Sequence, residues 1–409
     1  MFKTIASNTF AQLVAKFFGA GLTLLTTYFT IRLAGLDLYG DLTKILILVA
    51  VGFTAIDFGL NAEGLRSAKS PAQMQHNLSH ILLARFVLSL LAIIVLNLII
   101  IRLPGGYSPQ VKSIFWLGSL AIMFQGIYTS TNAWFQYNLS YWKSTISVVI
   151  GSLLATILTL YFLSHSPTIP NLVFANTAGY LAMAISSLLL LPRSQFENLR
   201  IYDLKFVLPL LRRSLTLGLI LIASVLASKF DTVVLGVFRA SSEVGQYGFA
   251  YRIFDVILVL PVFAMNSIYP IFLQSSKTNP QSSLISRTAW SMAGIGVVVA
   301  VILWFIAPLV SLVKPGLTIS IEVLKILSFA LPFFYVTAPL MWGLIAGGRD
   351  KVVLGIYVLA ALFNVGLNLV FVPGFGAPAA AVNTGLTELF IFLALLYFSN
   401  NKFENQRII

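Results

Sequence analysis

Long apolar runs separated by short polar segments extend along the whole chain. Twelve of these runs have about the 20 residues that a helix needs to cross the hydrocarbon core of a bilayer. They lie at 9–33, 42–61, 81–103, 114–135, 144–164, 171–192, 215–236, 245–270, 289–313, 322–347, 352–372 and 378–398. A membrane β-barrel would instead show alternating segments of about ten residues. The pattern therefore predicts an all-α integral membrane protein with twelve transmembrane helices.

The Lys and Arg residues predict how these helices are oriented. If both termini face the cytoplasm, fifteen of these residues fall in cytoplasmic segments and five fall on the opposite side. Short cytoplasmic loops of membrane proteins carry such an excess. Residues 1–8 and the apolar run after them lack the short apolar region and the small-residue cleavage site of a signal peptide. We therefore expect both termini in the cytoplasm, with the first run as the first span.

The second half of the chain repeats positions of the first half. Tyr39-Gly40-x3-Lys44-Ile45 recurs 208 residues later as Tyr247-Gly248-x3-Arg252-Ile253. At nearly the same offset stand Trp134 and Trp342, Lys143 and Lys351, Pro170 and Pro378, and Asn176-Thr177 and Asn383-Thr384. Since six spans return a chain to its starting side, these matches predict two parallel six-helix repeats, 1–205 and 206–409, around a central cavity. Transporters with parallel repeats bind substrate between the halves, near the middle of the bilayer.

The composition narrows the possible functions. Hydrophobic residues make up 58% of the chain and charged residues only 10%, whereas a soluble domain has about 25% charged residues. There is no Cys and there are three scattered His, so neither a disulfide nor a metal site is expected. The net charge of +13 resides in short loops between apolar runs, which argues against nucleic-acid binding. The charged segment 193–213 is expected to be either a surface helix or a solvated loop.

Polar groups within the first span are candidates for a substrate site. Gln12 and Lys16 belong to a polar stripe at helical spacing, together with Asn8, Gly19, Thr23, Thr27 and Thr30. Such a stripe either lines a cavity or provides a small-residue packing face. Lys16 favours the cavity, because packing does not require an ammonium group and intramembrane cations usually face the bundle interior.

Two further pairs of charged residues lie in or near spans. Lys44 and Arg252 occupy equivalent positions in the two halves, where they either line the cavity or extend to the membrane surface. Lys229 and Asp231 are two residues apart in the seventh span, so they point to different sides of a helix. We therefore expect each of them to have a separate partner.

Acids, prolines and amides also occur in or near the spans. Asp255 follows Arg252 at i+3, within pairing reach, and Asp57 and Glu388 are the other acids near or within spans. Kinks are expected at Pro261, Pro332 and Pro339, and Asn364 and Asn368 form an i,i+4 amide pair that is expected to link helices. Nucleotide-binding, serine-hydrolase and metal-protease motifs are absent. We therefore expect no enzyme activity and no cofactor.

Several motifs occur together in a characteristic order. They are Arg32-Leu33-Ala34-Gly35 with Tyr39-Gly40, Asp57-Phe58-Gly59-Leu60, Asp231 with Leu235-Gly236, Val244-Gly245-Gln246-Tyr247, Pro270, and Gly374-Phe375-Gly376-Ala377 before Thr387-Glu388. In this order the chain resembles the oligosaccharide flippases, the O-antigen and exopolysaccharide branch of the multidrug/oligosaccharidyl-lipid/polysaccharide exporter superfamily. Pro378 departs from the second Gly-Ala step that this family often has. The two extra spans of lipid II flippases are also missing, which disfavours lipid II as the substrate.

The resemblance implies translocation of undecaprenyl-diphosphate-linked oligosaccharide from the cytoplasmic to the outer leaflet of a bacterial inner membrane, for surface polysaccharide biosynthesis. A diphosphate needs cations to replace its water in a low-dielectric path, and the expected substrate-binding residues are Gln12, Lys16, Lys44, Lys229 and Arg252. An H+ or Na+ gradient would drive alternating access, and the expected ion-coupling residues are Asp231, Asp255 and Glu388. Expected partners are the lipid bilayer, a polysaccharide polymerase and a chain-length regulator.

Three other interpretations remain open. A multidrug antiporter of the same superfamily would use acids and aromatic residues to hold a cationic drug. A major-facilitator transporter also has two parallel six-span halves, but its acid-Arg-x-Gly-Arg-Arg pattern is absent between the second and third spans. A non-transporting membrane scaffold would not need a polar stripe that contains Lys16.

Overall fold

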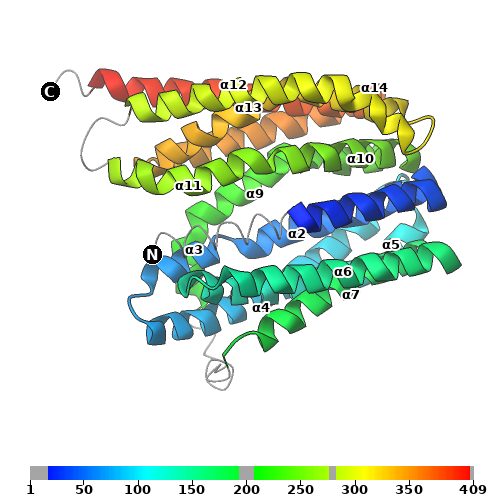
Figure 1. The fold of residues 1–409 in the computed structure, drawn as a ribbon, viewed down its shortest axis with the longest axis horizontal. Coiled ribbons are helices and arrows are strands. Elements are labelled where there is room, and N and C mark those ends of the chain that lie inside the picture. Colours follow the sequence, from blue (N-terminus) through cyan, green and yellow to red (C-terminus); the bar gives the residue numbers. More distant parts are fainter. Residues whose placement is uncertain (1–16, 193–206, 276–281, 406–409) are drawn as a thin grey trace. The chain divides into compact units, whose positions relative to one another are not determined.

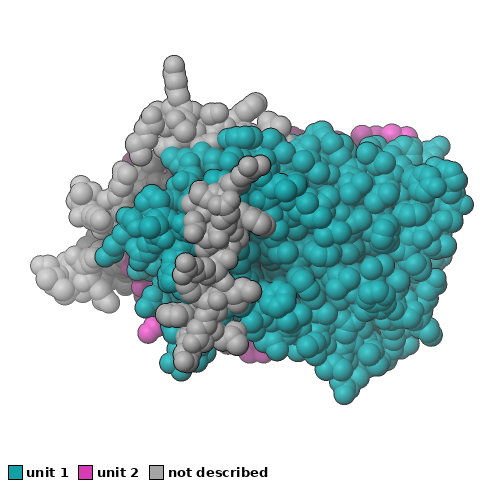
Figure 2. All heavy atoms as spheres, turned by 90° about the horizontal axis from the view of Figure 1, so that it is seen from below, with its two compact units in different colours: residues 1–222 teal, residues 223–409 magenta. Residues whose placement is uncertain are grey.

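The computed structural model describes residues 17–192, 207–275 and 282–405, and every regular element among them is a helix. Within these described residues, ten helices are long and apolar enough to cross a membrane. This agrees with the all-α membrane protein predicted from the apolar runs. The chain divides into two compact units, residues 1–222 and 223–409 (Figure 2).

Unit 1 is built around α5. After a helical stretch over residues 17–29, its elements are a π-helical turn at Thr30–Ala34, α2 (Gly35–Asp57), α3 (Leu60–Ser67), α4 (Pro71–Arg102), α5 (Pro109–Tyr137), α6 (Tyr141–His165) and α7 (Ile169–Leu189) (Figure 1). Helix α5 packs against α2, α4 and α7, and α6 packs against α7. Gly151 and Gly179 bring α6 and α7 together, since a Cβ on Gly151 would lie 2.6 Å from the carbonyl oxygen of Gly179.

Local sequence explains where α4 and α5 begin. Ser70 and Ser108 each precede a proline, which is favoured in the first helical turn because it has no N–H to leave unsatisfied. The Ser70 hydroxyl accepts a hydrogen bond from the Gln73 N–H at 3.2 Å, and the Ser108 hydroxyl accepts one from the Val111 N–H at 3.3 Å. Both serines are therefore N-caps.

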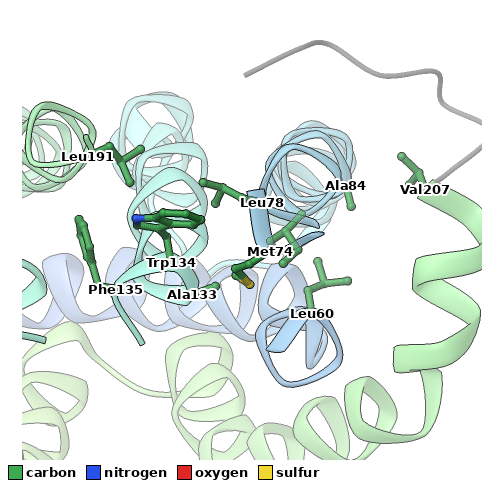
Figure 3. Close-up of a cluster of buried hydrophobic side chains, with 10 residues drawn as sticks. Leu60, Met74, Leu78, Ala84, Ala133, Trp134, Phe135, Leu191 and Val207 are labelled. Carbon is green, nitrogen blue, oxygen red and sulfur yellow. The ribbon is translucent and has the colours of Figure 1, made fainter. Parts of the chain in front are cut away.

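A cluster of buried apolar side chains joins four helices of unit 1. It gathers around Trp134 of α5 (Figure 3), and its other members are Leu60, Met74, Leu78, Ile81, Ala84, Ala133, Phe135, Leu191 and Val207. These residues come from α3, α4, α5 and the start of α9 (Val207–Phe238), with Leu191 just after α7. The cluster thus ties the short helix α3 to the long helices of this unit.

Unit 2 is organised around α13. It contains the rest of α9, then α10 (Ser241–Ile257), α11 (Val259–Ser275), α12 (Ser282–Ile306), a 3-10 turn at Ala307–Leu312, α13 (Thr318–Ala346) and α14 (Asp350–Asn405) (Figure 1). Helix α13 packs against α10, α11, α12 and α14. It continues through Pro332 and Pro339.

The motif that begins at Asp57 interrupts an apolar helix. Helix α2 ends at Asp57, and the next two residues, Phe58 and Gly59, have φ of 45° and 68°. Glycine is required at position 59, because this left-handed conformation disfavours a side chain and a Cβ there would lie 2.8 Å from the Cβ of Leu217. Helix α3 then starts at Leu60.

The kink predicted at Pro261 coincides with a break between two helices. Helix α10 ends at Ile257 and α11 begins at Val259, so the predicted span 245–270 contains two helices. Proline has no N–H to bond to the carbonyl four residues earlier, which is that of Ile257. The Tyr335 hydroxyl donates a hydrogen bond to this carbonyl at 3.0 Å. A side chain of α13 therefore satisfies the acceptor that Pro261 leaves open.

Element α14 consists of two antiparallel helical arms that meet at Gly376. Its backbone leaves helical geometry at Gly376, with φ of 66° and ψ of −144°. The Asn364 amide donates to the Thr387 hydroxyl at 3.0 Å, and the Asn383 amide donates to Asn368 Oδ1 at 3.2 Å. These pairs face each other across Gly376, so the two arms run in opposite directions. The predicted role of Asn364 and Asn368 in linking helices is confirmed.

Candidate functional site

A buried polar network in unit 2 begins at Asp231 of α9, whose side chain is 0% exposed. Its carboxylate accepts hydrogen bonds from the hydroxyl groups of Tyr247 in α10, Thr384 in α14 at 2.9 Å and Thr232 at 3.1 Å, and from the Thr232 N–H. Buried polar atoms need such partners, because they have lost their water. Three helices thus hold one carboxylate by uncharged donors.

Lys229, half a helical turn from Asp231, has a different set of neighbours. Its Nζ lies 2.8 Å and 2.9 Å from the two carboxylate oxygens of Asp255 in α10. It also lies 4.0 Å from the ring centroid of Tyr251, and the Tyr251 hydroxyl donates to the Ser228 carbonyl at 2.8 Å. The prediction that Lys229 and Asp231 have separate partners is confirmed.

The second arm of α14 carries another buried acid. Glu388 is 7% exposed and lies one helical turn after Thr384. The Thr337 hydroxyl of α13 donates a hydrogen bond to its Oε1 atom. Because Thr384 binds Asp231 and Glu388 is on the same arm, α14 brings the two acids into one polar region. Five charged residues that were predicted as site residues therefore lie in unit 2. They are Lys229, Asp231, Arg252, Asp255 and Glu388.

Lys44 lies in unit 1, where its side chain is buried. Its Nζ is 3.2 Å from Asp41 Oδ1 and donates to the Gly106 carbonyl at 2.6 Å. The Tyr107 ring centroid is 5.8 Å away, and burial raises the pKa of the Tyr107 hydroxyl above its ordinary value. These contacts hold the ammonium group beside Asp41 and the loop between α4 and α5, and extension to the membrane surface remains one of its two predicted roles. Its predicted substrate-binding role stays a prediction.

Arg85 of α4 is a buried cation whose role the sequence analysis missed. Its guanidinium donates to Asp57 Oδ1 at 2.8 Å, Asn61 Oδ1 at 2.8 Å and the Ser130 hydroxyl at 3.2 Å. It also donates to the carbonyl of Ile56 at 3.3 Å, one of the acceptors left open where α2 ends. The signal was present in the sequence, because an Arg inside an apolar run needs a partner and Asp57 is an acid near a neighbouring span.

Two of the predicted substrate-binding residues, Gln12 and Lys16, lie outside the described residues. Among residues 17–192, 207–275 and 282–405, no group of three His, Cys, Asp or Glu side chains has the arrangement of a metal site. The network of unit 2 is therefore the strongest candidate site that the structure describes.

Known proteins match this chain along most of its length. The profile of a family described as "Polysaccharide biosynthesis protein" matches residues 5–276. A protein of Shigella dysenteriae named "Putative O-antigen transporter" is 22% identical over 375 residues, which are 89% of this chain and 92% of that protein.

Solved structures of membrane transporters share the fold. A lipid II flippase in an inward closed conformation has a TM-score of 0.75 at 16% identity, with 94% of this chain and 86% of that chain covered. An inward-facing multidrug resistance MATE transporter of the MOP superfamily has a TM-score of 0.77 at 12% identity, with 94% and 95% covered. The resemblance inferred from the ordered motifs is thereby confirmed, and the ten long apolar helices are those of a multi-pass membrane protein.

Proposed function

Because the chain belongs to the Polysaccharide biosynthesis protein family, we propose that it is a flippase for undecaprenyl-diphosphate-linked oligosaccharide. It moves this substrate from the cytoplasmic to the outer leaflet of a bacterial inner membrane by alternating access, for surface polysaccharide biosynthesis. The name of the Shigella dysenteriae relative supports an O-antigen precursor as the cargo. The fold shared with a lipid II flippase supports a lipid-linked substrate.

The observation that carries this proposal is the environment of Lys229. A cation within a span costs about 2.5–3.5 kcal/mol on insertion scales, and Asp255 and the Tyr251 ring offset that cost here. The Lys229 side chain is still 23% exposed, so an anionic group can approach its ammonium. Arg252, one helical turn before Asp255, adds a second cation to this part of α10. The diphosphate head group is anionic and would find here the cations that replace its water.

The two buried acids support coupling to an ion gradient. Among the described residues, Asp231 and Glu388 are held by hydroxyl donors and not by a salt bridge, and Lys229 is a charge near Asp231. A carboxylate of this kind can exchange a proton or a Na+ ion when the helices around it move. We therefore assign ion coupling to Asp231 and Glu388, with Asp255 as the group that responds to substrate.

The proposed architecture has twelve spans in two six-helix repeats, 1–205 and 206–409, with both termini in the cytoplasm. The antiparallel arms of α14 support it, because they account for the two predicted spans 352–372 and 378–398. The apolar helical stretch Phe17–Ser67 is also long enough for two crossings at 51 residues. Its π-helical turn at Thr30–Ala34 covers the end of the first predicted span, and Gly35, with a φ of 90°, lies between that span and the next.

Complementation of a bacterial strain that lacks its own oligosaccharide flippase tests the function. The wild-type chain should restore surface polysaccharide, measured together with protein abundance in the same cells. A Lys229→Ala, Asp255→Asn double variant removes both charges of the pair, so neither charge is left without its partner. It should accumulate normally and lose transport, whereas the control Lys351→Ala, at an exposed position in the first turn of α14, should transport normally.

Two results would count against the proposal. Normal surface polysaccharide in the double variant at normal abundance would exclude Lys229 as an anchor for the head group. Failure of the wild-type chain to restore polysaccharide, combined with new resistance to cationic drugs, would instead favour a multidrug antiporter.

A further inference from the structure

We propose that Asp255 is an exchangeable counter-ion, which binds Lys229 while the site is empty and is displaced by the diphosphate of the substrate. The identity of the displacing anion rests on the proposed function. The exchange itself rests on the geometry of the pair and on how it differs from the other charged groups of the spans.

The Lys229–Asp255 pair is accessible at both ends. The side chain of Lys229 is 23% exposed and that of Asp255 is 44% exposed. The Lys44 and Arg85 side chains, by contrast, are each 1% exposed, and both also donate to backbone carbonyls. Those two cations are fixed by groups that cannot leave. Among the described residues, the Lys229 ammonium donates hydrogen bonds to Asp255 alone.

The two acids on either side of Lys229 are held differently. Asp231 accepts hydrogen bonds from donors on three helices and is fully buried. Within the described part of the chain, the Asp255 carboxylate accepts its hydrogen bonds from one ammonium group, that of Lys229. Displacing Asp231 would leave several buried donors unsatisfied, which is costly. Asp255 can be displaced at lower cost, because its carboxylate regains water and an incoming phosphate takes its place on Lys229.

The Tyr251 ring keeps the ammonium in position during the exchange. It lies 4.0 Å from Lys229 Nζ, and its hydroxyl is held by the Ser228 carbonyl next to Lys229. The cation therefore keeps a contact that does not depend on Asp255. Since the ion pair joins α9 to α10, its loss on substrate binding releases a link between these two helices. Substrate binding thereby allows α9 and α10 to move relative to each other.

Binding of farnesyl diphosphate to the purified full-length protein in detergent tests the exchange, with farnesol as the uncharged control. Asp255→Asn keeps the shape of the side chain and removes the competing charge, so binding should tighten about tenfold. Asp255→Glu keeps the charge and should bind like the wild type, as should Glu322→Gln, which removes an exposed acid of α13. Lys229→Ala should weaken binding about tenfold or more.

The outcomes separate the exchange from the function. If the wild type does not bind farnesyl diphosphate, the proposed substrate class is wrong. If the wild type binds it and Asp255→Asn binds no more tightly, or Asp255→Glu tightens equally, the exchange is wrong and the function stands.

A second measurement on the wild-type protein does not depend on the stability of any variant. Water-soluble carbodiimide labels exposed carboxylates, and mass spectrometry locates the label. Farnesyl diphosphate should raise labelling of Asp255 and leave Glu322 unchanged, because the exchange frees the Asp255 carboxylate from Lys229. Unchanged or reduced labelling of Asp255 at saturating probe would overturn the proposal.

Discussion

Replacing Arg85 with Met should destabilise unit 1 without touching the network of unit 2. The side chain is 1% exposed, and its guanidinium holds Asp57, Asn61 and Ser130 together with the carbonyl of Ile56. Methionine retains most of the apolar length and removes all of these donors. The acceptors at the end of α2 would then lie in a buried site with no donor.

The size of the effect follows from the exposure of the two partners. Removing one partner of a buried ion pair costs about 3–5 kcal/mol, because the other charge stays unpaired. Asp57 is 43% exposed and can regain water, which places the expected loss near the lower limit, at about 3 kcal/mol. Arg85→Lys keeps the charge and loses the planar fork, so its loss should be smaller.

Intrinsic tryptophan fluorescence during unfolding in detergent provides the assay. Trp134 reports on this region, because its cluster includes Ala84, the residue before Arg85. Arg102→Met is the matched control, since Arg102 is an exposed residue at the end of the same helix, and its effect should stay within about 0.5 kcal/mol. Adding Asp57→Asn to Arg85→Met should restore part of the loss. If Arg85→Met unfolds like the wild type, or if Asp57→Asn restores nothing, the contacts of Arg85 do not stabilise unit 1 as predicted.

Three further predictions concern topology and the helix breaks. Reporter fusions after Leu191 and after Phe398 should both report the cytoplasm, as the distribution of Lys and Arg requires, and a periplasmic signal from either fusion would refute twelve spans with both ends inside. Gly376→Ala should lower stability by about 1–3 kcal/mol, because its φ of 66° and its ψ suit only glycine and Glu243 and Arg239 fill the space for a Cβ. Gly374→Ala is the control, since a Cβ there meets nothing within 4 Å. If the two variants unfold equally, the prediction is wrong. Tyr335→Phe should lower the free energy of unfolding by about 1 kcal/mol in the same assay, since the Ile257 carbonyl loses its donor. In combination with Pro261→Ala this loss should disappear, because the backbone N–H at position 261 then becomes the donor.

Much of the fold could be predicted because hydropathy, length and charge are local properties of the sequence. An apolar run of about 20 residues satisfies its backbone polar groups in lipid only as a helix, so the all-α membrane class follows from the runs alone. The break at Pro261 follows from the missing N–H of one residue. The separate partners of Lys229 and Asp231 follow from the 3.6-residue period of a helix.

Only the tertiary structure decided which side chains meet. Asp255 was placed within reach of Arg252 along α10, yet it binds Lys229 on another helix, 26 residues earlier. Thr384 reaches Asp231 across 153 residues, and no local pattern records that distance. An Arg inside an apolar run needs a partner, but the fold decided which groups Arg85 binds, since they come from the end of α2, from α3 and from α5. Contacts of this kind depend on the rotation and register of packed helices, which the whole set of interlocking side chains determines together.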